Sequence, residues 1–386
     1  MISPQRHLFD MPRDVAYLNT AYMGPLMHSV AKAGEAGLRL KARPWNLTIP
    51  DFFDPVTEAR ALFAQMVHGD AAGVAIVPSA SYGIAVAALN LSVGAGRHVI
   101  VLKDQFPSHV YSWKRLADTT GGTLKPVTPP PGQAATEAVL AAINSQTAIV
   151  AVPNVLWTTG AKVDLLAVRA RCDEVGAALV LDLTQSAGAM EINFADVRPD
   201  FAVAATYKWL LGPYALGFLW AAPDRRNGVP LEEGWITRAN GRDFAGLTDY
   251  TDEYMPGAER YDMGERANFS AMPAAVAALR QLLEWGVPEI EATLTARNAM
   301  LSERLSEIGL SPTPAEARGG HFLGAALPEQ APVDLIAQLA GHNVHVSARG
   351  GSLRITPHLW NDDEDFDKLI SALNAVLPPN RKRQSR

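Results

Sequence analysis

The sequence predicts an α/β protein with a mainly parallel sheet, helices on both faces of that sheet, and a smaller α+β unit toward the C-terminus. Two observations support this fold class. In the middle of the chain, short apolar runs rich in Val, Ile and Leu alternate with stretches of helical periodicity. From about residue 270 the alternation gives way to two long helical patterns, several short strand patterns and a closing helix. The chain of 386 residues is long enough for two cores of unequal size.

The apolar runs and the stretches between them give the elements in order. Each run has about the length of a buried strand, and the runs are 74–77, 98–102, 148–152, 178–181, 201–204 and 216–220. The helical patterns between them are 81–91, 111–119, 136–142 and 163–175. The C-terminal unit is predicted to contain helices at 272–285, 287–308 and 362–376, with strands at 321–326, 344–347 and 352–356. In a parallel sheet of this kind, ligands bind at the carboxyl ends of the strands.

Composition excludes several classes of protein. Hydrophobic residues make up 48% of the chain and charged residues 19%, as in an ordinary globular protein. The net charge of −6 argues against a dedicated nucleic-acid binder, which is usually basic. The one strongly basic run is Arg381, Lys382, Arg383 and Arg386, which we interpret as a solvated tail.

Cysteine and histidine content argues against a structural metal or a disulfide framework. Cys172 is the only cysteine, and the nine histidines are scattered along the chain, so no metal site is expected. The N-terminal segment has no apolar core of a signal peptide, and no apolar stretch is long enough to span a membrane. We therefore expect a cytoplasmic protein without a membrane partner.

The most informative segments are LVLDLTQSAG at 179–188 and DFAVAATYKWLLGPYALG at 200–217. Asp182 ends a predicted buried strand, where a carboxylate needs a cationic partner. Lys208 follows another predicted strand and stands between two aromatic residues. A lysine in apolar surroundings has a lowered pKa and can act as an amine nucleophile. The alternative for Lys208 is a surface lysine whose aliphatic stem alone is buried.

The pattern D-x-x-Q-S-x-G, followed by a lysine after an aromatic residue and then a glycine turn, resembles the class V aminotransferases. These are fold-type I enzymes dependent on pyridoxal 5′-phosphate (PLP), and the group includes cysteine desulfurases, kynureninases and isopenicillin-N-epimerase-like proteins. The resemblance extends from YLNTA at 17–21 to RITPH at 354–358. It implies a large PLP-binding domain at 21–262 with a sheet of the seven-stranded type. Residues 1–20 and 263–386 would form the small domain.

The resemblance also implies a role for each residue around the cofactor ring and phosphate. Lys208 would form the Schiff base with PLP, Asp182 would pair with the pyridine nitrogen, and Gln185 would bond to the phenolate oxygen. In the turn PSASYG at 78–83, Ala80 and Ser81 would bind the phosphate at a helix N-terminus. The alternative for Ser81 is a simple helix N-cap.

Four further residues are assigned to the cofactor by the same resemblance. Tyr207 would contact the phosphate, and Phe106 would stack on the ring. Trp157, in a loop that would lie beside the cofactor, stands where relatives commonly have Asn, so it either packs on the substrate or is merely a wall residue. Asn268, in the segment RYDMGERANF, would reach the phosphate of a neighbouring subunit, which implies a homodimer with shared active sites. The alternative is that this segment is an exposed charged turn.

The substrate end of the site rests on two residues. Arg354 would bind the substrate carboxylate, because a guanidinium matches a carboxylate with two hydrogen bonds. The alternative is a structural salt bridge. Asn19, in the YLNTA segment, is also assigned to the substrate. The role of the nearby Arg349 is left undefined.

The leading hypothesis for the reaction is transamination of a small amino acid or amine, in which Lys208 would move a proton from the substrate Cα to C4′ of the cofactor. The alternatives are a C–S β-lyase or kynureninase-like hydrolase, an amino-acid epimerase, and a PLP-binding module without catalysis. An epimerase needs a second acid or base, for which Tyr111, His109 and His358 are candidates. A persulfide-forming desulfurase is not expected, because Cys172 lies in a helical run and Phe106 replaces the histidine of desulfurases.

Overall fold

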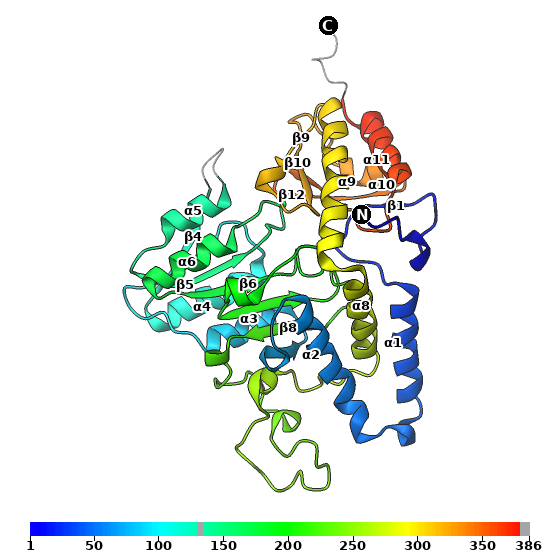
Figure 1. Ribbon diagram of the computed structural model, residues 1–386. Helices are drawn as coiled ribbons and strands as arrows, with labels where there is room; N and C mark the ends of the chain where they lie inside the picture. Colours follow the sequence, from blue (N-terminus) through cyan, green and yellow to red (C-terminus); the bar gives the residue numbers. More distant parts are fainter. Residues whose placement is uncertain (130–133, 379–386) are drawn as a thin grey trace.

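The computed structural model describes residues 1–129 and 134–378, so the basic run at the C-terminus lies outside the described residues. The larger part of the molecule is a sheet with helices on both sides, and a smaller unit packs at one end beside the N-terminal segment (Figure 1). No helix in the described part of the chain is long and apolar enough to cross a membrane.

The central sheet has seven strands among the described residues. In their order across the sheet these are β2 (Val74–Val77), β8 (Gly217–Ala221), β7 (Phe201–Ala205), β6 (Ala178–Asp182), β5 (Thr147–Pro153), β3 (His98–Leu102) and β4 (Thr123–Val127). Strand β8 is antiparallel to both of its neighbours, and the other pairs are parallel. The start of β8 therefore lies at the same edge as the carboxyl ends of the other strands.

Helices cover both faces of this sheet (Figure 1). Side chains of α3 (Ala80–Leu89) and α4 (Tyr111–Thr120) pack on one face, in a core that includes Val77 and Val99. The other face is covered by α2 (Asp54–Met66), α5 (Ala135–Ala142), α6 (Leu165–Val175), α7 (Phe194–Val197) and α8 (Ala271–Trp285). Helix α1 (His28–Lys41) packs along α8. Every strand except β4 at the sheet edge is buried on both faces, so its sequence is a continuous apolar run.

The smaller unit contains a four-stranded antiparallel sheet, in the order β12 (Ser347–Arg349), β13 (Ser352–Ile355), β10 (Leu323–Ala326) and β9 (Ser311–Pro312). Helices α9 (Val287–Glu307), α10 (Leu335–Gly341) and α11 (Asp363–Val376) pack around its core. Near the N-terminus, β1 (Ala16–Tyr17) pairs in parallel with β11 (Val344–His345). The N-terminal segment therefore packs with the C-terminal unit.

Local sequence signals explain where these elements begin and end. The side chain of Asp164 caps α6 by accepting hydrogen bonds from the backbone of Leu166 and Ala167. The same helix ends at Gly176, which adopts a positive φ of 66°. The predicted strands of the central sheet and the predicted long helices are confirmed to within a few residues, whereas the predicted strand 344–347 is divided between β11 and β12, which belong to different sheets. The sequence pattern missed β4, which lies at the sheet edge and contains Lys125 and Pro126, so it is not an apolar run.

Candidate active site

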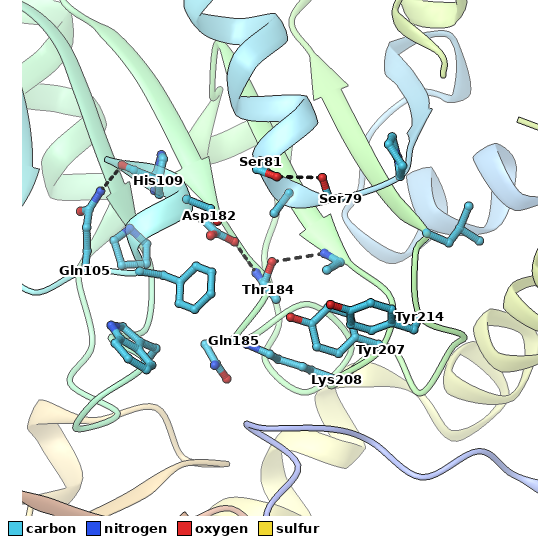
Figure 2. Close-up of a pocket in the computed structure, with 18 of the residues that line it drawn as sticks. Ser79, Ser81, Gln105, His109, Asp182, Thr184, Gln185, Tyr207, Lys208 and Tyr214 are labelled. Carbon is cyan, nitrogen blue, oxygen red and sulfur yellow. Dashed lines mark hydrogen bonds between the residues drawn. The ribbon is translucent and has the colours of Figure 1, made fainter. Parts of the chain in front are cut away.

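A cavity lies at the edge of the central sheet where the parallel strands end. Its wall is built from the segments that follow β2, β3, β5, β6 and β7 and from the segment just before β8. Eight residues expected at the cofactor line it: Ala80, Ser81, Phe106, Trp157, Asp182, Gln185, Tyr207 and Lys208. Figure 2 shows how several of these side chains converge. The cavity therefore lies where ligands bind in sheets of this topology.

Lys208 follows β7 and is buried, with 7% of its surface exposed. Its Nζ lies 5.4 Å from the ring centre of Phe106 and 5.5 Å from that of Tyr207. Burial lowers the pKa of Lys208 to about 8, with a further lowering by the charge of Arg354 and an opposing effect of Asp182. No carboxylate of the described residues lies within ion-pair distance of this amine. Near neutral pH, a minor fraction of Lys208 is therefore an uncharged nucleophile, far more than for a lysine with an ordinary pKa.

Asp182 is the last residue of β6 and is also buried. Its Oδ1 accepts a hydrogen bond of 3.0 Å from the backbone N–H of Thr184. The described part of the chain places no Arg, Lys or His within ion-pair distance of this carboxylate. A buried carboxylate is costly without a cationic partner, so the site suits a ligand that brings a positive charge to Asp182.

The amide of Gln185 has an orientation that chemistry alone determines. Trp209 Nε1 donates to Gln185 Oε1 at 3.0 Å, and Gln185 Nε2 donates to the carbonyl of Ala21 at 3.1 Å. An indole can only donate and a carbonyl can only accept, so the amide cannot be reversed. His321 bonds to the backbone oxygen of Gln185 at 2.6 Å, and burial lowers the pKa of this imidazole to about 4. The neutral imidazole therefore donates, and one amide N–H of Gln185 remains for a ligand.

The turn between β2 and α3 forms another part of the wall. The Oγ of Ser79 accepts from the backbone N–H of Tyr82 at 3.2 Å, so Ser79 is the N-cap and the alternative for Ser81 as N-cap is wrong. Ser81 Oγ lies 2.8 Å from Ser79 Oγ, which places two hydroxyl groups at the first turn of α3 (Figure 2). A Cβ on Gly83 would lie 2.5 Å from Val203, so glycine permits this helix to approach β7 closely. The helix N-terminus and both hydroxyl groups suit an anion.

Aromatic side chains close the cavity on two sides. Phe106 and Trp157 meet edge to face with ring centres 5.5 Å apart, and Trp157 Nε1 donates to the carbonyl of Asp104 at 2.7 Å. Tyr207 and Tyr214 lie together with ring centres 4.8 Å apart. Burial raises the pKa of Tyr207 to about 12, so its hydroxyl stays protonated and can donate. Trp157 is thus anchored in the wall by its own hydrogen bond.

Arg354 and Asn19 belong to one hydrogen-bond network behind Trp157, and neither of them lines the cavity directly. Arg354 donates from Nε and Nη2 to Ser347 Oγ, and from Nη1 to the carbonyl of Trp157 at 2.7 Å. Ser347 donates to Asn19 Oδ1 at 2.8 Å. Burial and the charge of Arg349 lower the pKa of Arg354 to about 10. Across the described ranges no carboxylate pairs with Arg354, so the structural salt bridge considered for it is not present.

Asn268 lies away from the cavity of its own chain, in a groove formed with α1 and α8. Its Oδ1 accepts hydrogen bonds from the backbone of Ser270 and Ala271, and so caps the start of α8. In the described residues, its Nδ2 makes no hydrogen bond. The structure of one chain does not test the predicted contact with a second subunit.

Sequence reasoning assigned no role at the cofactor to several other residues of the wall, among them Ser79, Gln105, His109, Thr184 and Tyr214. Four of these follow a strand of the sheet, and Tyr214 precedes β8, which is antiparallel. A search for polar residues soon after each predicted strand could therefore have found most of these wall residues. Such a search would have missed Tyr214, because an apolar run does not reveal that β8 is antiparallel and begins at the cavity.

Comparison with known proteins agrees with this geometry. A family model described as "Aminotransferase class-V" matches residues 50–359. An uncharacterized aminotransferase, YcbU, of Bacillus subtilis is 27% identical over 86% of this chain and 91% of its own length. Isopenicillin N epimerase of Streptomyces clavuligerus is 25% identical over 94% of this chain and 95% of its own length. A mutant of C-DES with glycine covalently linked to the PLP cofactor has the same fold, with a TM-score of 0.86 and 17% identity, over 97% of this chain and 100% of the other.

Proposed function

Because this chain belongs to the class V aminotransferase family, whose enzymes use PLP, we propose that it is a PLP-dependent transaminase of a small amino acid or amine. Lys208 is the observation that carries the proposal. It is the only lysine among the described residues that line the cavity, and its pKa of about 8 leaves part of it uncharged near neutral pH. An uncharged amine is what both covalent attachment of the cofactor and proton transfer require.

The wall of the cavity fits PLP group by group. Asp182 offers a buried, unpaired carboxylate for the pyridine nitrogen, and Gln185 offers one amide N–H for the ring oxygen. The first turn of α3, with the hydroxyl groups of Ser79 and Ser81, suits the phosphate. Phe106 supplies an aromatic ring near the amine. We assign these residues to the cofactor.

When bound, PLP supplies an electron sink that stabilises negative charge at the substrate α-carbon. The protein then has to move one proton from that carbon. Lys208 is the side chain suited to this step, because Tyr207 is held protonated and Asp182 is assigned to the ring nitrogen. Transamination needs one base that can carry the proton, whereas epimerisation needs acid–base groups on both faces of the α-carbon. His109 also lines the cavity, but burial lowers its pKa to about 4 and makes it a weak base, which favours transamination over epimerisation.

Arg354 and Asn19 are proposed to recognise the substrate carboxylate. Arg354 is 2% exposed and has no carboxylate partner in the described part of the chain, yet its charge already influences Lys208. A carboxylate beside Trp157 would provide the missing counter-charge. We therefore favour amino acids over simple amines as substrates.

We further propose a homodimer in which Asn268 reaches the phosphate site of the partner. The free Nδ2 of Asn268 lies beside an apolar groove, and the exposed Leu38 on α1 borders the same region. Mixing a Lys208→Ala variant with an Asn268→Asp variant tests this assembly. The heterodimer would contain one site with a native lysine and a native partner asparagine, so activity is expected to return on mixing. If the two variants are shown to exchange subunits and activity still does not return, the active sites are not shared between subunits.

Persulfide chemistry is not proposed. Cys172 lies on α6, is fully buried in the core and does not line the cavity. Burial raises the pKa of its thiol to about 12, which opposes formation of the nucleophilic thiolate.

The test is to incubate the purified enzyme with pooled amino acids and simple amines, with and without a keto-acid acceptor. A transaminase transfers nitrogen to the acceptor, so a new amino acid appears only when the acceptor is present. Release of ammonia, pyruvate or alanine without an acceptor would indicate a lyase or hydrolase instead. A change of chirality alone would indicate an epimerase, and no change of any amine would indicate a non-catalytic PLP-binding protein. Lys208→Ala is the control in every arm.

A further inference from the structure

His109 is a buried imidazole in the cavity wall to which the proposed reaction gives no task. It lies on a 3₁₀ turn, Pro107–His109, between β3 and α4, and is 1% exposed. Neither Nδ1 nor Nε2 has a hydrogen-bond partner among the described residues. A neutral imidazole carries one N–H donor and one acceptor, and buried polar atoms of this kind are normally paired.

The backbone around His109 is held firmly, although the ring nitrogens are free. The N–H of His109 donates to the carbonyl of Phe106 at 2.9 Å. Gln105 Nε2 donates to the carbonyl of His109 at 2.7 Å, while its Oε1 accepts from the backbone of Leu102 at 2.9 Å. The ring itself packs near Trp113, with ring centres 6.2 Å apart. The imidazole is thus kept at a fixed place in the wall.

Asp182 is a hydrogen-bond acceptor in the same cavity wall as His109. Both side chains line the same cavity (Figure 2), Asp182 at the end of β6 and His109 on the turn that follows β3, with β5 between these two strands. One oxygen of Asp182 accepts from Thr184, and the other has no protein partner within the described ranges. The charge of Asp182 acts on the imidazole, but burial is the larger effect and lowers the pKa of His109 to about 4. The ring is therefore neutral at physiological pH and has one N–H to donate.

We propose that His109 is a positioning residue for Asp182: its imidazole N–H bonds to the free carboxylate oxygen when the cofactor binds, and so fixes the carboxylate toward the pyridine nitrogen. This inference rests on the proposed function, because it requires that Asp182 pairs with the pyridine nitrogen of PLP. The two carboxylate oxygens would then be held by Thr184 and His109.

The test compares His109→Phe with His109→Gln and with a matched control, His358→Phe. Phenylalanine keeps a flat ring of similar size but has no donor, and glutamine restores an N–H. His358 is equally buried and neither ring nitrogen has a partner among the described residues, but it lies outside the cavity wall. Each variant is stripped of cofactor, checked for folding by circular dichroism, and titrated with PLP while tryptophan fluorescence is recorded.

The dissociation constant of PLP is expected to rise about 10- to 100-fold in His109→Phe, the usual effect of losing one hydrogen bond to a charged group. It should recover partly in His109→Gln and stay unchanged in His358→Phe. Equal affinity of His109→Phe and wild type would overturn the inference and leave the proposed function intact. Failure of the wild-type protein to bind PLP would overturn both.

A second measurement does not depend on the folding of a variant. In the proton NMR spectrum of the wild-type protein, addition of PLP should produce a low-field resonance of a hydrogen-bonded imidazole N–H. Selective ¹⁵N labelling of histidine, together with the ring-nitrogen shifts, assigns that resonance to His109. If His109 shows no such resonance in the PLP-bound protein, the inference is wrong.

Discussion

Two groups of buried cations in this protein have opposite surroundings. Beneath β2, Arg60 and Arg266 both pair with the fully buried carboxylate of Asp262, and Glu259 lies 3.0 Å from Arg266. At the cavity, Lys208 and Arg354 are also buried, but the described residues offer neither of them an ion pair. Burial of a charge is tolerated in the first group because each cation has a counter-charge. In the second group the counter-charge has to come from a ligand.

The paired cluster is structural, because its remaining contacts tie main-chain segments together. Asp262 Oδ1 accepts from the backbone N–H of Ile76 at 2.7 Å, and Met263 N donates to the carbonyl of Ile76 at 2.8 Å. Arg60 on α2 donates to the carbonyl of Val74. These contacts fix β2, the strand that leads to the phosphate turn. Burial alone therefore does not identify a functional cation; Lys208 and Arg354 combine burial and the lack of an ion pair in the described residues with a place at or beside the cavity.

The largest effect is expected from Lys208→Ala. Loss of the amine removes both cofactor attachment and proton transfer, so turnover should fall by about 10⁴-fold or more. The fold should be as stable as before or more stable, because an unpaired buried cation is removed. Activity assays and thermal unfolding of the cofactor-free protein measure the two effects. Lys103→Ala, at an exposed position, is the control. Turnover close to wild type would refute the assignment of Lys208.

Asp262→Asn should have the reverse signature, a loss of stability. The change leaves two buried guanidinium groups with a neutral partner, and breaking a buried ion pair in this way destabilises by about 3–5 kcal/mol. Urea unfolding of the cofactor-free protein measures the loss. The variant molecules that remain folded should turn over substrate normally, since Asp262 does not line the cavity. If the variant is stable but turns over substrate poorly, the cluster around Asp262 is functional and not structural.

Arg354→Gln should raise KM for carboxylate substrates by about 10- to 100-fold, which corresponds to the loss of one charge-assisted interaction. For a simple amine the effect should be small. Arg318→Gln is a matched control. Arg318 is also buried and forms no ion pair with the residues that the structure describes, but it donates to the carbonyls of Thr313, Gly319 and Gly320, outside the cavity wall. An equal loss for amines and amino acids would make Arg354 structural.

The smallest effect is a dependence of stability on pH. In the cofactor-free protein the pKa of Lys208 is about 8, against 10.5 in its ordinary state. Between these values the unfolded chain binds a proton that the folded chain does not, so stability rises with pH in this window. Below pH 8 both states carry the proton, and Lys208 contributes no slope. The contribution is at most about 1.4 kcal/mol per pH unit.

Chemical unfolding of the wild-type protein and of Lys208→Met, from pH 7 to pH 10.5, isolates this contribution. The wild-type protein should gain stability relative to the variant as pH rises. Parallel curves for the two proteins would show that the lysine titrates normally in the folded state.

The chain order explains which parts of the site could be predicted. Asp182 and Lys208 stand directly after apolar runs, so periodicity and local motif placed them at one edge of the sheet. The network of Asn19, Ser347 and Arg354 joins segments more than 300 residues apart, and only Ser347 and Arg354 are near in sequence. No local pattern specifies such a pairing.

Other features were out of reach of sequence reasoning for different physical reasons. The direction of β8 depends on its hydrogen-bond partners, which an apolar run does not encode. The unpartnered state of His109 depends on packing around its ring. Because Arg60 and Asp262 are 202 residues apart, the paired cluster also escaped prediction.

The contacts of Gln185 have a consequence for the synthesis of the protein. Every described residue that lines the cavity has been translated once the ribosome passes Leu216. The main-chain oxygen of Gln185, however, is bonded by His321, which emerges much later. A nascent chain that ends before His321 therefore contains every described residue of the cavity wall but lacks the hydrogen bond from His321 to Gln185. We expect tight capture of the cofactor to mark a completed chain, so that truncated translation products stay unloaded.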